Sequence, residues 1–282
     1  MLLLLPPSEG KTPAPDGAAP VDLAALTAAA ELTPQRTAVL DALAAVSARP
    51  DATTVLGVGD SLAAEVERNT RLRTEPAGPA AHVYTGVLYA AADLAALTAD
   101  AGSEASARAA ASVRIFSGLW GMVAPADRVP AYRLSGGVDL PGVGKLSTAW
   151  RGPLSEALDA RAAGDVVVDC RSATYVAAWK PRTTGPDAAE WVTVRVVREA
   201  GGKRTVVSHN AKHTRGVLAG HLLRREAQPP TSADELARAA GELVGQVVGT
   251  EVGSGLSYRM LEATLHAATS KTAPQTLELV VG

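Results

Sequence analysis

Residues 1–12 read MLLLLPPSEGKT, and they indicate the architecture of the whole chain. Leu2–Leu5 is short and entirely apolar, as in a central strand that is buried on both faces. It runs directly into PPSEGKT, which places Ser8, Lys11 and Thr12 at the carboxyl end of this strand. Loops in this position carry many of the binding and catalytic groups of α/β proteins. We therefore expect a functional site that includes this loop.

The composition describes a chain with enough apolar residues for a large core. Its 282 residues are 47% hydrophobic and carry a formal net charge of -2, so any nucleic-acid contact has to come from a local patch. A single cysteine, Cys170, excludes an internal disulfide framework and favours a reducing compartment. MLLLLPP lacks the basic start and the length of a signal peptide, and no run reaches the about 18 apolar residues of a transmembrane helix. We expect a cytoplasmic protein with no membrane contact.

Strand and helix patterns are intermixed along the chain, without a linker or a repeat. This predicts one mixed α/β domain over residues 1–282, with a central mixed sheet and helices around it. A Gly-Gly turn at 201–202 between two alternating segments predicts a hairpin. Over 21–48 we expect two helical stretches broken near Pro34, and TTVLGV (53–58) indicates a strand or a buried segment. Further strands are expected near the following positions: 113–117, 165–170 and 276–282.

Three predicted strand ends carry polar side chains: residues 8–12, 114–117 and 208–212. We expect the three to converge on one pocket, because α/β proteins bind ligands at the carboxyl ends of their strands. The loop that follows the second strand is rich in glycine and polar groups, namely Arg114, Ser117, Asp127, Arg128, Tyr132 and Arg133. The alternative is that ion pairs such as Asp127 with Arg133 only brace this loop.

Residues 195–225 form a basic segment whose one acid is Glu199. Lys212 and Arg215 lie three apart at the start of a predicted helix, just after a strand end and close to Asn210. A helix N-terminus already favours anions, so unpaired cations there predict anion binding.

Two other motifs favour structural explanations. GVGDSLAAE (57–65) resembles a nucleophile block with Ser61, but none of the histidines has an aspartate three residues before it. His209 and His213 are spaced for one helix face, yet their neighbours are cations rather than further metal ligands. The sequence therefore predicts no metal site, and no cofactor is evident.

DLPGVGK (139–145) leaves three alternatives open: a phosphate cradle, the hairpin of a helix-hairpin-helix, or an ordinary tight turn. The segment before it reads as extended chain and a Gly-Gly turn, whereas a helix-hairpin-helix needs a helix on both sides. Taken alone, the stretch predicts a Pro-Gly turn that opens a helix.

Five stretches, in order from residue 1 to about 222, are together similar to one known family. They read MLLLLPPSEGKT, VYTGVLY, RIFSGLWGMVAPADRVPAYRL, VDCRSATYVAAW and SHNAKHTRGVLAGHL. The chain thereby resembles the YaaA family of peroxide stress proteins, in its actinobacterial form. The resemblance implies a cytoplasmic protein that is linked to hydrogen-peroxide stress, lowers free iron and limits oxidative DNA damage. It also implies a single compact domain with a positively charged cleft that binds DNA.

By position, the recurrent polar and glycine residues of that family fall on Lys11, Thr12, Thr85, Gly86, Tyr89, Arg114, Ser117, Gly118, Gly121, Asp127, Tyr132, Arg133, Ser172, Tyr175, Lys212, Arg215 and Gly216. Two functions follow. In the first, the cleft binds DNA through Lys11, Thr12, Ser117, Arg133, Lys145, Asn210, Lys212 and Arg215. In the second, the cleft is the active site of an enzyme that acts on a small anionic or nucleobase-like substrate, with or without peroxide. Its catalytic groups would be Lys11, Arg114, Asp127, Tyr132, Arg133 and Tyr175. A deep closed pocket would favour the enzyme, and an open groove as wide as a duplex would favour DNA.

Overall fold

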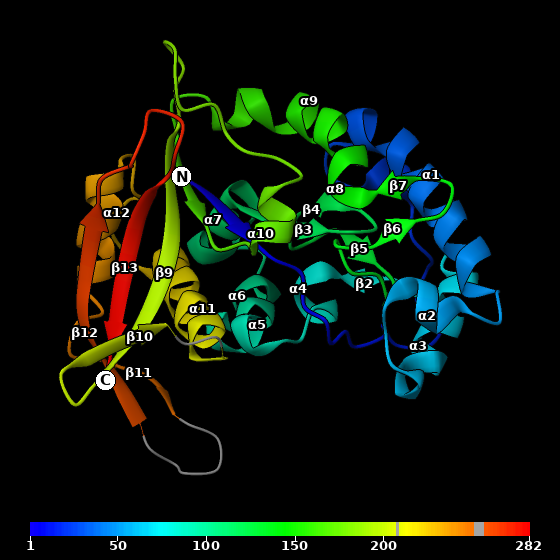
Figure 1. The fold of residues 1–282 in the computed structure, drawn as a ribbon, viewed down its shortest axis with the longest axis horizontal. Helices are drawn as coiled ribbons and strands as arrows, with labels where there is room; N and C mark the ends of the chain where they lie inside the picture. Colours follow the sequence, from blue (N-terminus) through cyan, green and yellow to red (C-terminus); the bar gives the residue numbers. More distant parts are fainter. Residues whose placement is uncertain (207–208, 251–256) are drawn as a thin grey trace.

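The computed structural model describes residues 1–206, 209–250 and 257–282, and only the backbone of Val206, His209 and Asn210. A mixed sheet of nine strands runs through these residues (Figure 1). Its strands are β1 (Leu2–Leu5), β3 (Val113–Ser117), β4 (Gly121–Val123), β8 (Val166–Asp169), β9 (Glu190–Ala200), β10 (Lys203–Val206), β11 (Val247–Thr250), β12 (Ser257–His266) and β13 (Gln275–Val281). They lie in the order β11-β12-β13-β9-β8-β1-β3-β4, and β10 pairs with β9 outside this path.

Five neighbouring strands of this sheet, β3, β1, β8, β9 and β13, run parallel. The four leucines of β1 are fully buried, as expected for a strand that is covered on both faces. From β1 the chain first adds β3 on one side and later adds β8 on the other. The connection that leaves β1 therefore runs toward β3 on one side, and the connection that leaves β8 runs toward β9 on the opposite side. This topological switch point is where open α/β sheets form a crevice for ligands.

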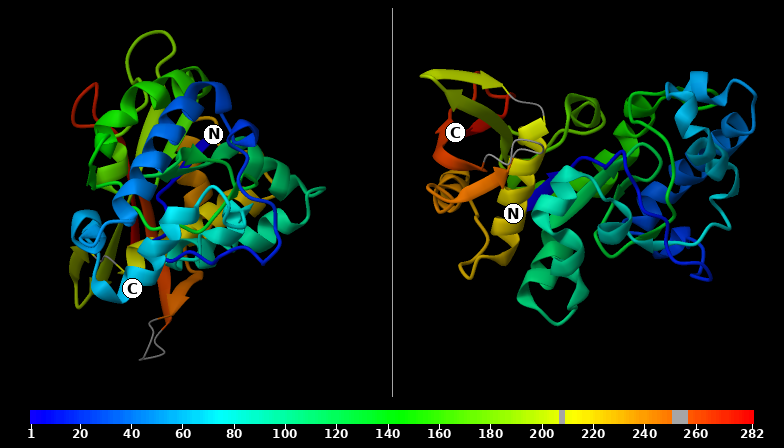
Figure 2. Two further views of the ribbon diagram at one scale, coloured as in Figure 1. Left: turned by 90° about the vertical axis from the view of Figure 1, so that its right-hand side faces the viewer. Right: turned by 90° about the horizontal axis from the view of Figure 1, so that it is seen from below.

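Twelve α-helices of the described residues surround the sheet: α1 (Ala29–Ser47), α2 (Ala52–Leu56), α3 (Ala63–Arg68), α4 (Ala80–Val83), α5 (Val87–Ala92), α6 (Leu94–Ala99), α7 (Glu104–Ser112), α8 (Leu146–Ala149), α9 (Arg151–Ala162), α10 (Ala173–Val176), α11 (His209–Arg224) and α12 (Ala233–Gly241). Two small ribbons pair β2 (Gly78–Pro79) with β5 (Arg128–Val129) and β6 (Asp139–Leu140) with β7 (Gly144–Lys145). Helices α1 to α3 lie at one end of the molecule and β9 to β13 at the other (Figures 1 and 2). No helix of the described residues is both long and apolar enough to cross a membrane.

Helices α5 and α11 pack closely through two glycines that are one turn apart. A Cβ atom on Gly216 would lie 2.2 Å from the carbonyl oxygen of Leu88, and one on Gly220 would lie 2.8 Å from that of Ala92. These distances are far below van der Waals contact, so only glycine lets the two backbones approach this closely. The contact sets the middle of α11 against α5.

The mixed α/β class with a central mixed sheet is confirmed, as is the hairpin, which turns at Gly201 and Gly202 with positive φ at both residues. Two local predictions were wrong. Pro34 does not break the helix as predicted. It lies inside the continuous helix α1, whose apolar side packs on the core. Residues 53–58 contain most of helix α2, which ends at Gly57 in the left-handed conformation. The β-branched residues there suggested a strand, and helical packing against α1 overrides this weak preference.

The stretch 139–145 forms the β6–β7 ribbon, and helix α8 follows it directly. Gly142 and Gly144 have positive φ, which explains the glycines of DLPGVGK. No helix precedes the ribbon between β5 and β6, so the two-helix frame of a helix-hairpin-helix is not formed here. The turn-then-helix prediction for this stretch is confirmed.

Candidate functional site

A cavity of about 310 Å³ opens at the switch point, at the carboxyl ends of β1 and β8. Four segments line it: residues 6–10 after β1, residues 86–89 at the start of α5, Cys170, Ser172 and Tyr175 after β8, and Lys212 and Arg215 on α11. We call this cavity the switch-point pocket. It brings together two of the three predicted strand ends, because residues 8–10 and Lys212 both line it.

The backbone of the loop after β1 is held by two cationic side chains. The Lys11 ammonium donates to the carbonyl oxygen of Ser8 at 2.8 Å, and Nη1 of Arg133 donates to that of Glu9 at 2.8 Å. Arg133 also pairs with two carboxylates, at 3.1 Å from Glu9 and 3.6 Å from Glu65. The charge of Arg133 is therefore compensated by acids, and it adds little positive potential to the pocket.

The segment that leads into α5 holds the same loop from the other side. The backbone N–H of Thr85 donates to the carbonyl oxygen of Gly10, and that of Thr12 donates to Val83. Thr12 is exposed, and its hydroxyl lies 3.5 Å from that of Thr85. A Cβ atom on Gly86 would lie 2.3 Å from Oγ of Ser8, so the two pocket walls touch at this glycine. The loop is thus fixed in place rather than free to adapt.

Lys11 lies over the face of a tyrosine. Its Nζ is 4.2 Å from the ring centroid of Tyr132 and 5.6 Å from that of Tyr84. Burial lowers the pKa of Lys11 from 10.5 to about 8; the nearby Glu9 opposes this shift and Arg133 adds to it. An amine with such a pKa can exchange a proton near neutral pH.

A chain of hydroxyl groups runs behind Lys11. Oγ of Ser117 accepts from the backbone N–H groups of Leu119 and Trp120, so its own proton must go to the hydroxyl of Tyr132 at 2.7 Å. The hydroxyls of Tyr132 and Tyr84 share a further hydrogen bond at 3.0 Å. Burial raises the pKa of Tyr84 to about 12 and that of Tyr132 well above 10, so both keep their protons. Tyr132 is therefore a protonated member of a hydroxyl chain rather than a base.

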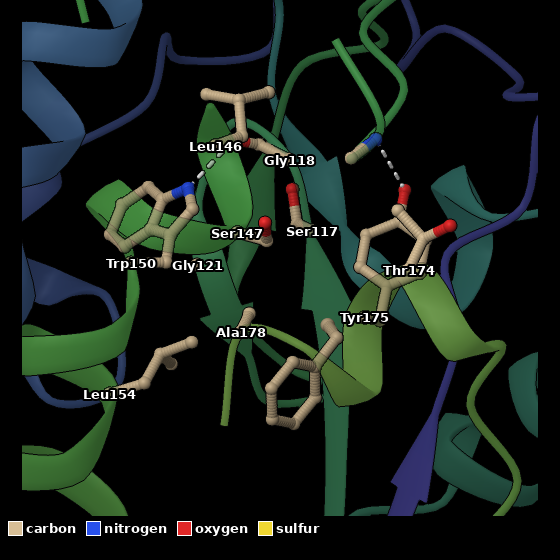
Figure 3. A pocket seen from close by; sticks show the side chains of 12 residues that line it. Ser117, Gly118, Gly121, Leu146, Ser147, Trp150, Leu154, Thr174, Tyr175 and Ala178 are labelled. Carbon is tan, nitrogen blue, oxygen red and sulfur yellow. Dashed lines mark hydrogen bonds between the residues drawn. The ribbon is translucent and has the colours of Figure 1, made fainter. Parts of the chain in front are cut away.

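Tyr175 contributes a phenol to the pocket from helix α10. Its hydroxyl accepts from the backbone N–H of Gly136 at 3.0 Å (Figure 3). Burial raises its pKa, so the phenol stays protonated and its proton is available to a ligand. The second cavity beside this ring, drawn in Figure 3, has a volume of only about 10 Å³ next to Trp150. It holds at most a single water molecule and is not a substrate site.

The two cations of the pocket on α11, Lys212 and Arg215, differ in how available they are to a ligand. Arg215 directs Nε and Nη2 at the carbonyl oxygen of Val194 in β9, at 3.0 and 2.7 Å. Lys212 is exposed, and no described residue forms an ion pair with it. Lys212 is thus the more available positive charge of the pocket, while Arg215 joins α11 to the sheet.

A family model described as Peroxide stress protein YaaA matches residues 1–242. The chain belongs to this family. A UPF0246 protein of Streptomyces coelicolor is 44% identical over 268 residues, which are 94% of this chain and 99% of the relative. A UPF0246 protein of Corynebacterium efficiens is 41% identical over 251 residues, or 86% and 94% of the two chains, and one of Ruegeria pomeroyi is 32% identical over 163 residues, or 56% and 60%. YaaA membership suggests a role related to peroxide stress.

Three residues that the sequence assigned to the site lie elsewhere. Arg114 is near the amino end of β3, where Nη1 donates to backbone carbonyls of α7 and β3. Asp127 accepts from the segment before α1 and from the end of β4, so it braces this loop, although without the expected pair to Arg133. Lys145 is exposed on β7. Figure 1 shows this strand near α1 and apart from α5 and α11. The side chain of Asn210 lies outside the described residues, and so does that of His209 in the His209–His213 pair.

Three buried or pocket-lining charged groups were missed by the sequence reasoning. Arg36 is fully buried and donates to the carbonyl oxygens of Trp120 and Met122, so it holds the glycine-rich loop after β3. Arg171 forms a buried bidentate pair with Asp169 at 2.9 and 2.7 Å. The third group is Glu9. The sequence does contain a signal for Arg36. It is a charged residue four positions after Leu32, on the otherwise apolar side of the helix, which indicates a buried charge.

Proposed function

We propose that this YaaA-family protein is an enzyme of the peroxide response and that its small polar substrate binds in the switch-point pocket. The observation that carries the proposal is the cavity of about 310 Å³ at the carboxyl ends of β1 and β8. That volume falls in the range of small-molecule sites, and the position is the one where open α/β sheets bind ligands. A DNA duplex is far too wide for it.

The lining residues offer the polar groups that a small substrate needs. Lys212 presents a positive charge, and the protonated phenol of Tyr175 is a hydrogen-bond donor. Lys11 contacts the pocket wall through the Ser8 carbonyl, and its pKa of about 8 suits proton transfer. In this proposal Lys212 and Tyr175 bind the substrate, and Lys11 is the reservoir for a proton.

Filling the pocket tests the proposal. Ser172 is exposed, lines the pocket and makes no side-chain cap bond to α10, so Ser172→Trp should block the cavity without loss of folding. Its neighbour Ala173 is also exposed but does not line the pocket, which makes Ala173→Trp the matched control. Nucleobases, nucleosides, nucleotides and organic acids are screened by thermal shift, and by mass spectrometry of products with and without hydrogen peroxide.

We expect at least one compound to stabilise the wild type and Ala173→Trp, or to be converted by them. The same compound should neither stabilise Ser172→Trp nor be converted by it. If no compound in the panel binds to the wild type, or if Ser172→Trp responds in the same way, the pocket is not a substrate site.

DNA binding is the second candidate, and it is supported by two exposed cations. Lys145 on the β6–β7 ribbon and Lys212 on α11 form no ion pair with a described residue. Binding to phosphates weakens with salt, with a log–log slope of about -0.9 per phosphate neutralised. Lys145→Ala and Lys212→Ala should each lower the slope by about 1 in fluorescence anisotropy with labelled duplex, and exposed Lys271→Ala should not. Equal slopes for all four proteins would remove this candidate.

A further inference from the structure

Glu9 places a negative charge in a pocket whose other charged lining residues are cations. Among the described residues that line the switch-point pocket, it is the sole carboxylate, and its side chain is 66% exposed. A carboxylate at this place repels phosphate groups and other strong anions. A site built only for an anion gains nothing from this carboxylate, whereas a ligand with N–H donors can pair with it even beside Arg133.

The position of this carboxylate is set by the loop that carries it. As described above, the carbonyl oxygens of Ser8, Glu9 and Gly10 each accept a hydrogen bond from a different partner. Only the Glu9 side chain is left to move, and it leaves the backbone at a fixed point of the pocket wall. Groups that are held in this way discriminate between ligands, because the protein does not rearrange to accommodate the wrong one.

The present partner of Glu9 identifies the chemistry that the carboxylate accepts. Nη1 of Arg133 divides its hydrogen bonds between the carbonyl oxygen and Oε2 of Glu9, at 2.8 and 3.1 Å. The carboxylate thus receives one N–H from a guanidinium, and Oε1 has no partner among the described residues. Carboxylates bind best to two parallel N–H groups on one carbon atom, the edge that a guanidine or an amidine presents.

The walls of the pocket add shape to this requirement. Tyr89 and Tyr175 line it with aromatic rings, and Lys212 supplies a donor for an acceptor group of the ligand. Resting on the function proposed above, we propose that Glu9 selects a planar heterocycle with an amidine-type donor edge, H–N–C–NH₂, and that it excludes phosphorylated ligands. The edge pairs with both oxygens of Glu9, and an acceptor elsewhere on the ring faces Lys212.

The test compares two probes that differ in this edge. Isocytosine carries the N–C–NH₂ edge, whereas uracil has a carbonyl oxygen in place of the amino group. Calorimetric titration of the full chain should give at least about tenfold tighter binding of isocytosine, as expected for a hydrogen bond to a charged group. Glu9→Gln should lose this preference. Glu65→Gln should keep it, because Glu65 pairs with the same Arg133 but does not line the pocket.

Several results would overturn the proposal: equal affinity for the two probes, a preference that survives in Glu9→Gln, no detectable binding of isocytosine, or tighter binding of inorganic phosphate by the wild type. Glu9→Gln should fold normally because the side chain is largely exposed, and its thermal unfolding checks this. If other compounds bind to the wild type and Ser172→Trp abolishes their binding, the pocket stands and only the assignment of Glu9 fails.

Discussion

Replacing Gly216 by alanine should lower the free energy of unfolding by about 2 kcal/mol. The new Cβ atom would lie 2.2 Å from the carbonyl oxygen of Leu88 and 2.8 Å from Cβ of Ala91. Because a backbone carbonyl cannot rotate away, α11 has to move from α5, and such overpacking costs about 3 kcal/mol at the upper end. The better helix propensity of alanine returns about 1 kcal/mol of this. The same shift carries Lys212, one turn earlier on α11, away from the pocket.

Urea denaturation followed by tryptophan fluorescence measures the change in stability. The control is Gly241→Ala, because Gly241 is also helical and a Cβ atom there would meet open space. That control should be stabilised by about 0.4–1 kcal/mol. If Gly216→Ala is as stable as the wild type or gains stability as the control does, the close contact between α5 and α11 is not a structural requirement.

Three further predictions concern buried charges and the thiol. The pKa of Lys11 is about 8 in the folded protein, against 10.5 ordinarily, so the unfolded chain binds more protons between these values. The free energy of unfolding of the wild type should therefore gain a contribution that rises from pH 8 to pH 10. Lys11→Met should lack this contribution, which is measured by comparing the denaturation curves of the wild type and the variant at the two pH values. Asp169→Asn leaves the fully buried Arg171 without a counter-ion and should cost about 3–5 kcal/mol, measured in urea. Burial raises the pKa of the Cys170 thiol to about 12, so a disulfide reagent at pH 7.5 should react only after unfolding, and rapid reaction of the native protein would contradict this.

The parts of the structure that the sequence predicted well depend on local patterns. Four consecutive leucines define β1, and Gly201-Gly202 defines the turn between β9 and β10. The placement of the site followed from one topological rule, that the carboxyl ends of parallel strands share an edge. That rule accounts for residues 8–10 and for Cys170, Ser172 and Tyr175, which follow the parallel strands β1 and β8. Lys212 reaches the same pocket on α11, although the strand before it, β10, runs antiparallel to β9.

The parts that could not be predicted depend on contacts between distant segments. Arg114 was grouped with the carboxyl end of its strand, whereas it is the second residue of β3. Glu9 reads as a solvated loop residue until Arg133 is seen beside it. Likewise, the hydroxyl chain from Ser117 through Tyr132 to Tyr84 joins residues whose spacing follows no period. Ion pairs and hydroxyl relays of this kind are set by tertiary packing, and a single sequence carries no signal for them.

The position of β13 has a consequence for how the protein is made. This strand lies between β9 and β12, and Gln275 pairs with Val192, so β9 lacks its neighbour on that side until the ribosome has added residues 275–281. During synthesis, the edge of β9 is therefore an open template of unpaired N–H and C=O groups, and such edges associate with other chains. We expect the nascent protein to depend on chaperones, or on rapid completion of translation, for as long as that edge stays open.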